Sequence, residues 1–103
     1  MTITLARVVQ TCRACPSQWD AWTVTGQYLY LRYRFGIGTV QAQPSADPDT
    51  WVGGGELLAE FGESSMDGTI ELEEFCAGAA LELAPGAEVV PWAEYWRSEM
   101  RRR

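Results

Sequence analysis

The sequence predicts an α+β fold in which an antiparallel meander of three or four strands is packed by two or three short helices. Apolar and polar residues alternate over much of residues 1–43, which is the period of a half-buried strand. Over residues 56–102 the apolar positions recur every three to four residues, which is the period of an amphipathic helix. The chain has 103 residues and forms one domain, because two domains would each lie near the lower limit for a stable core.

Four segments of the first half are predicted to be strands: residues 2–8, 18–24, 27–35 and 39–43. Thr25 and Gly26 predict a tight turn between the second and third strands, and residues 36–38 (Gly-Ile-Gly) predict the next turn. The third strand has the most regular alternation. One of its faces is apolar and is expected to meet the core: Leu29, Leu31, Tyr33 and Phe35.

The second half is predicted to be mainly helical. Short helices are expected over residues 56–61, residues 71–81 and a last segment that begins at Pro91. Pro85 and Gly86 are expected to break the second helix from the third. The apolar strand face should meet these side chains of the helices: Leu57, Leu58, Phe61, Leu72, Phe75 and Trp96.

The chain contains no histidine and no lysine. This removes a histidine general base, a lysine Schiff base, a P-loop lysine and every metal site that uses histidine. Neighbouring carboxylates such as Glu73 and Glu74 point about 100° apart on a helix, so they do not converge on one substrate. We therefore expect a protein that is not an enzyme and that holds no cofactor.

The net charge is −6, and it is unevenly spread. Residues 1–46 hold four arginines and one acid, whereas residues 47–103 hold thirteen acids and four arginines. Binding to duplex DNA depends on neutralising phosphates, so this balance disfavours duplex DNA as a partner. No apolar run approaches the roughly 18 residues of a membrane span, and no signal peptide is recognised. Three cysteines, an odd number, suit a reducing compartment, so we expect a cytoplasmic protein with no membrane contact.

Cys12 and Cys15 form a CxxC motif, which can bind zinc as half of a four-ligand site or act as a redox pair. Only Cys76 remains to extend the set, and carboxylates would have to complete it. The motif is followed by Pro16 and a predicted strand, whereas a redox pair usually opens a helix. Structural thiols in a turn are therefore the competing interpretation.

Residues 63–75 resemble an EF-hand calcium loop. Gly68 matches the sixth loop position, where glycine permits a sharp bend, and Ile70 matches the apolar eighth position. Two departures are plain, because the first position is glutamate instead of aspartate and the third is only serine. An Asp-Gly turn before an acidic helix start would give the same letters. The resemblance implies these calcium ligands: Glu63, Ser65, Asp67, Thr69 (by its carbonyl), Glu71 and Glu74.

The outward face of the third strand combines two aromatic rings with two guanidinium groups: Tyr28, Tyr30, Arg32 and Arg34. Single-stranded nucleic acid or a nucleotide is recognised by this combination, since bases stack on the rings and phosphates meet the arginines. The competing interpretation is that the acidic second half covers this face. The arginines would then pair with carboxylates, and the tyrosines would pack under the aromatic last helix.

The last helix carries an apolar stripe composed of Trp92, Tyr95, Trp96 and Met100. Five tryptophans are more than one small core usually needs, and tryptophan concentrates at interfaces. The stripe could dock in its own domain. Otherwise it is expected to meet a protein partner or a second copy of the chain as a homodimer.

Residues 15–22 (CPSQWDAW) and 26–36 (GQYLYLRYRFG) resemble a pattern of small uncharacterised proteins of actinobacteria and their phages. The resemblance covers roughly the first third of the chain and transfers no functional residue. It implies an accessory protein that binds a host or phage component. Taken together, the sequence predicts a small non-enzymatic binding protein that acts on a protein partner. Nucleic-acid binding and a module stabilised by zinc or calcium are the alternatives.

Overall fold

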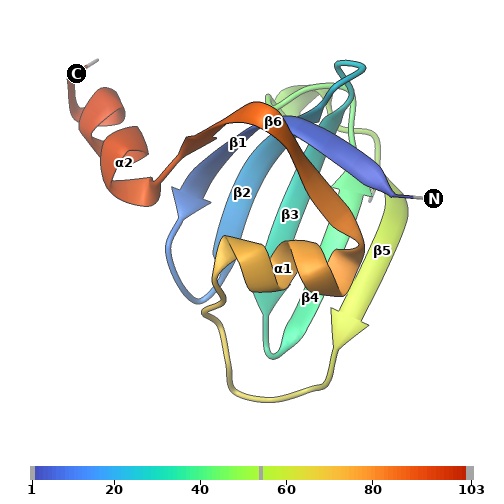
Figure 1. Ribbon diagram of the computed structural model, residues 1–103. Helices are drawn as coiled ribbons and strands as arrows, with labels where there is room; N and C mark the ends of the chain where they lie inside the picture. The colour runs from blue at the N-terminus through green and yellow to red at the C-terminus, as the bar shows by residue number, and fades with distance from the viewer. Residues whose placement is uncertain (1, 54, 102–103) are drawn as a thin grey trace.

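The structure is a computed structural model and describes residues 2–53 and 55–101. Figure 1 shows the arrangement of the elements. Their order is β1 (Ile3–Cys12), β2 (Ser17–Thr23), β3 (Tyr28–Arg34), β4 (Ile37–Ala42), η1 (Pro48–Thr50), β5 (Glu56–Gly62), α1 (Leu72–Ala79), β6 (Leu81–Val90) and α2 (Trp92–Arg101). The α+β class is confirmed. The sheet, however, has six strands and is mixed. The predicted antiparallel meander of three or four strands therefore accounts for only part of it.

The strands lie in the order β5-β4-β3-β2-β1-β6. Every neighbouring pair from β5 to β1 is antiparallel, whereas β6 runs parallel to β1. The four strands predicted in the first half are confirmed. The turn after β3 lies earlier than predicted, because Phe35 and Gly36 connect the paired residues Arg34 and Ile37. Phe35 therefore leaves the apolar face of β3 and is 51% exposed, contrary to its predicted place in the core.

Residues 56–61 form a strand, so the helix predicted there is wrong. In β5 the half-buried Ala59 and Phe61 pack against the core, while Leu57 and Leu58 are 54% and 38% exposed. A segment this short fits both the helical and the strand period, so its pairing with β4 decides its structure.

The second predicted helix is confirmed as α1, but it ends earlier, with Ala80 in the left-handed conformation. The chain then forms β6, which was not predicted. β6 pairs with β1 in two stretches, and the pairing skips residues 84–87, where Pro85 and Gly86 lie. Proline cannot donate a backbone hydrogen bond, and it is tolerated here because β6 is an edge strand. Beyond the interruption, the side chains of Arg7 and Glu88 form an ion pair between the two strands.

Helix α1 lies across one face of the sheet, and the core is the layer between them (Figure 1). Phe75 of α1 is fully buried, with its ring centroid 5.3 Å from that of Trp19 and 5.0 Å from that of Phe61. Trp96, predicted to join this core, is instead 47% exposed. The core cluster consists of Leu5, Val8, Trp19, Ala21, Leu29, Leu31, Val40, Phe75, Cys76, Ala79 and Leu81.

Helix α2, red in Figure 1, stands beyond the end of β6 and away from α1. It begins at Trp92, one residue after the predicted start, and packs mainly against β1. The backbone N–H of Trp92 donates to Oε1 of Gln10 at 3.3 Å, which fixes the start of the helix to the end of β1. Within the described ranges, the helices are too short and too polar to cross a membrane.

Candidate functional site

The outer face of the sheet, opposite α1, carries the aromatic and arginine residues of β3 as predicted. Trp51, which follows η1, lies over this face with its ring 6.3 Å from that of Tyr28 and 5.1 Å from that of Tyr30. Trp22 adds a further ring contact to Tyr28, which is only 2% exposed. Trp51 therefore covers the two tyrosines, whereas the sequence suggested that the last helix would cover them. A base could stack on them only if Trp51 moved.

The two tyrosine hydroxyls are used within the sheet. Tyr28 donates to the carboxylate of Asp20, and Tyr30 donates to the side-chain oxygen of Gln18. Burial is the main cause that raises the pKa of Tyr28, Tyr30 and Asp20; for Asp20 the hydrogen bond from Tyr28 acts in the opposite direction. Both phenols therefore stay protonated at neutral pH, and this part of the outer face is structural.

The end of the outer face next to the β3–β4 turn is open. A hollow of about 260 Å³, the arginine hollow, is lined by Arg32, Arg34, Phe35, Ile37 and Thr39. The guanidinium of Arg34 lies 4.8 Å from the centre of the Phe35 ring. Among the residues described, neither arginine forms an ion pair, and Nε of Arg32 is buried with no hydrogen-bond partner. The pairing with carboxylates that the sequence suggested for these arginines is not formed.

The residues predicted to bind metal are not brought together. Across residues 2–53 and 55–101, no three Cys, Asp or Glu side chains lie close enough to share a metal ion. A strand, β5, precedes the calcium-loop segment, so the entering helix of an EF-hand is missing. The carbonyl of Gly68 accepts from the N–H groups of Cys15 and Ser17 at 2.8 and 3.0 Å, so it ties the loop to a hairpin. The residues concerned are Cys12, Cys15, Glu63, Ser65, Asp67 and Glu74.

The three cysteines are unpaired and differ in exposure, so we expect them to differ in reactivity. Iodoacetamide at pH 8 should modify the exposed Cys15 in the native protein and reach Cys76 only after unfolding. Cys76 is 7% exposed, and burial, with the nearby Glu73 carboxylate, raises its pKa to about 11. About one Cys76 in a thousand would then be a thiolate, the form that reacts. Peptide mass spectrometry at successive times checks this order, and equal rates at the two cysteines would contradict the burial of Cys76.

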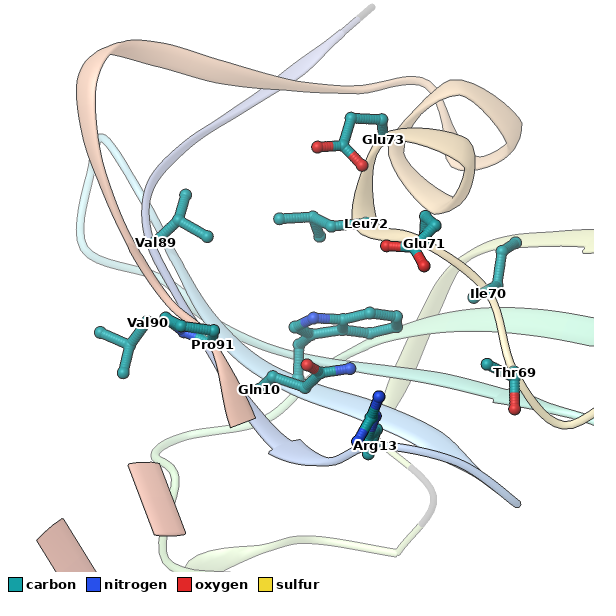
Figure 2. A pocket seen from close by; sticks show the side chains of 11 residues that line it. Gln10, Arg13, Thr69, Ile70, Glu71, Leu72, Glu73, Val89, Val90 and Pro91 are labelled. Carbon is teal, nitrogen blue, oxygen red and sulfur yellow. The ribbon is translucent and has the colours of Figure 1, made fainter. Parts of the chain in front are cut away.

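A pocket of about 410 Å³ lies beside the start of α1, on the same side of the sheet as this helix. Its lining includes the indole of Trp19, which is 3% exposed. Figure 2 shows Glu71 and Glu73 at the start of α1, with Val89 and Val90 of β6 across the pocket from them. Gln10 and Arg13 lie opposite, at the end of β1 and in the turn that follows it. The pocket therefore has apolar walls and charged groups of both signs.

Sequence reasoning missed this pocket, although its volume is in the range of small-ligand sites. Its lining comes from four separate stretches of the chain, residues 10–13, 19, 69–73 and 89–91. The one sequence feature that could have indicated the pocket was the pair Glu71 and Glu73. Acids at the start of a helix are already explained by the helix dipole, so this pair did not point to a site. The parallel pairing of β6 with β1 brings the last stretch to the first.

The predicted stripe of Trp92, Tyr95, Trp96 and Met100 lies on α2. Trp96 and Met100 are 47% and 54% exposed, and the rings of Trp92 and Trp96 are stacked with centroids 6.1 Å apart. Val90 and Pro91, at the base of α2, line the pocket of Figure 2. The stripe and the pocket are therefore neighbours.

The arginine hollow, the pocket and the stripe of α2 offer donors, acceptors and apolar surface, which suits all three to binding. The hydrogen-bond donors that line the hollow and the pocket are mainly arginine guanidinium groups. The acceptors are carboxylates and the side-chain amide of Gln10. Comparisons with protein-family models, with curated proteins and with solved structures found no match to this chain.

Proposed function

We propose that this protein is a small non-enzymatic binding protein of the cytoplasm that engages a protein partner through α2. The observation that carries the proposal is the exposure of Trp96 and Met100 on a helix that stands apart from the core. Large apolar side chains that stay exposed together mark interaction surfaces, and tryptophan is enriched among the residues that dominate binding energy. The three free cysteines support a reducing compartment.

The stripe has the geometry of a helix that lies in a groove of its partner, with side chains at positions i, i+3, i+4 and i+8. The pocket at the base of α2 could receive one further apolar side chain. Residues 92–103 hold four arginines and two glutamates, whereas residues 1–91 hold four arginines and twelve acids. The stripe therefore suits an apolar groove, and the net positive charge of this end of the sequence favours an acidic partner. A second copy of this acidic chain, giving a homodimer, is one form that the partner could take.

The double variant Trp96→Glu with Met100→Glu should remove partner binding and leave the fold intact, because both side chains are exposed. The expected loss is at least about 30-fold, since residues that dominate an interface contribute about 2 kcal/mol or more. The matched control is Val52→Glu with Met66→Glu, which adds the same charges at positions that are 74% and 89% exposed. Native mass spectrometry and affinity capture followed by a Kd measurement compare the two. Equal binding by both variants would contradict the proposal.

A second candidate function, binding of single-stranded nucleic acid or a nucleotide, is favoured by one observation: Arg32 and Arg34 have no ion-pair partner among the residues described. Titration with a single-stranded oligonucleotide at two salt concentrations should quench tryptophan and tyrosine fluorescence. The affinity should fall with salt, because phosphate contacts release counterions. Unchanged affinity in Arg32→Ala with Arg34→Ala would exclude this function.

A further inference from the structure

We infer that the hollow at the end of β3 is a binding site for the phosphate group of a small phosphate monoester. This arginine hollow consists of Arg32, Arg34, Phe35, Ile37 and Thr39. It is separate from α2, so it does not depend on partner binding. It also needs neither of the tyrosines that Trp51 covers, so it stands whether or not the protein binds an oligonucleotide.

The donors of the arginine hollow are arranged on two neighbouring strands. Arg32 and Arg34 are alternate residues of β3, so their side chains leave the same face from backbone positions about 6.6 Å apart. Thr39 lies directly opposite Arg32 on β4, which places its hydroxyl on that face as well. A carboxylate has two oxygens and a single negative charge, and one guanidinium fork already occupies both oxygens. A phosphate monoester has three free oxygens and can accept from both forks and the hydroxyl.

Within residues 2–53 and 55–101, no acidic side chain pairs with the arginines of the hollow. Nε of Arg32 is buried with no hydrogen-bond partner, and a buried donor in this state favours any ligand that accepts from it. The chain has fourteen acids, yet within the described residues none forms an ion pair with Arg32 or Arg34. Glu60 lies on β5 opposite Thr39, two strands away from Arg32. Asp67 lines a small neighbouring hollow that Arg34 and Phe35 also line, and it forms no ion pair with Arg34. An anion from outside the chain would therefore meet unpaired guanidinium groups.

Phe35 indicates that the ligand has an organic part beside its phosphate. Phe35 and Gly36 both have positive φ, 54° and 78°, in a two-residue hairpin turn of the type that favours Asn-Gly. Phenylalanine is a poor residue for this conformation, and its ring is not buried in compensation, being 51% exposed. The guanidinium of Arg34 instead lies over this ring in a cation–π contact. With Ile37 it gives the hollow an apolar border on which the organic group of a monoester could rest.

Titrations followed by NMR on 15N-labelled protein test the inference directly. The probes are inorganic phosphate, phenyl phosphate and benzoate, each at constant ionic strength with sodium chloride. The Nε–Hε resonance of Arg32 should shift on addition of either phosphate, and phenyl phosphate should bind several-fold more tightly than inorganic phosphate. Benzoate should bind at least about tenfold more weakly than phenyl phosphate, because it carries a smaller negative charge and has two acceptor oxygens instead of three.

Variants distinguish binding of phenyl phosphate in the arginine hollow from nonspecific attraction of its phosphate to any arginine. Arg34→Gln should weaken phenyl phosphate binding at least about tenfold, which is the effect of losing one charge-assisted pair. Arg97→Gln, which removes an exposed arginine outside both the arginine hollow and the pocket beside Trp19, should leave it unchanged. Glu60→Gln should tighten it, because it removes a negative charge on the same face. Equal weakening by Arg34→Gln and Arg97→Gln, or equal shifts with chloride alone, would overturn the site.

If Arg34→Gln does not fold, Phe35→Asn still tests whether the hollow binds a phosphate monoester. Asparagine suits this turn, so the variant should be at least as stable as the wild type in thermal unfolding. It should still bind inorganic phosphate but lose the preference for phenyl phosphate. If the wild type binds both phosphates equally, or if Phe35→Asn keeps the preference, the assignment of a monoester is wrong.

Discussion

Replacing Phe75 with alanine is expected to lower the free energy of unfolding by about 3–5 kcal/mol, the usual range for removing a buried aromatic ring. The ring is fully buried and contacts Trp19 of β2 and Phe61 of β5, so it joins α1 to two separate strands. A domain of this size has about 5–15 kcal/mol in total, so a large part of the protein would be unfolded or marginal. Urea denaturation followed by tryptophan fluorescence measures the change.

Phe35→Ala is the matched control for Phe75→Ala, because it removes the same ring from a position that is 51% exposed. We expect a change of less than about 1 kcal/mol, since a surface substitution leaves no cavity. The difference between the two variants then measures the burial of Phe75. If both substitutions destabilise the protein equally, α1 is not held to the sheet by this ring.

Gly36→Ala is expected to lower the free energy of unfolding by at least about 3 kcal/mol, the second largest effect. Two costs add at this position. Its φ of +78° disfavours any side chain, and a Cβ would lie 2.1 Å from the carbonyl oxygen of Glu63 and 2.5 Å from Oγ of Ser65. The segment that follows β5 would have to move away from the turn, and it would lose the backbone hydrogen bond from Ser65 to Phe35. Thermal and urea unfolding both measure the loss.

Gly26→Ala separates the two costs. Gly26 has a similar positive φ of +91°, but nothing lies within 4 Å of the position that its Cβ would take. Only the backbone penalty applies there, and we expect about 1–2 kcal/mol. Equal destabilisation by the two variants would mean that the segment at Glu63 moves to accommodate the new methyl group without a measurable loss of stability.

The parts of the fold that local rules govern were predictable from the sequence. The hairpins β2–β3 and β3–β4 join neighbours in the chain, and alternation in β3 correctly separated Leu29 and Leu31 from the tyrosines and arginines of the outer face. Helix α1 followed from its spacing, since Phe75, Cys76 and Ala79 are buried on one side. Local pattern and final structure agree in these elements because no distant segment competes with them.

Distant pairing explains what could not be predicted. β5 has a pattern that fits either period, and only its ladder with β4 makes it a strand. β6 contains Pro85 and Gly86, which normally end an element, and it is held by a partner about eighty residues earlier in the chain. The same applies to the candidate sites. The outer-face residues were identified, but nothing local places Trp51 over Tyr30, and the pocket beside Trp19 exists only once the first and last strands meet.

The pairing of β1 with β6 also determines when the sheet can be completed during synthesis. β1 leaves the ribosome before β2, which can pair with one of its edges as soon as it follows. The other edge of β1 has no partner until residues 81–90 have been made. Until then the nascent chain displays an unpaired strand edge, the kind of surface that recruits other chains into aggregates. Slow folding and sensitivity to truncation before β6 are therefore expected to accompany this topology.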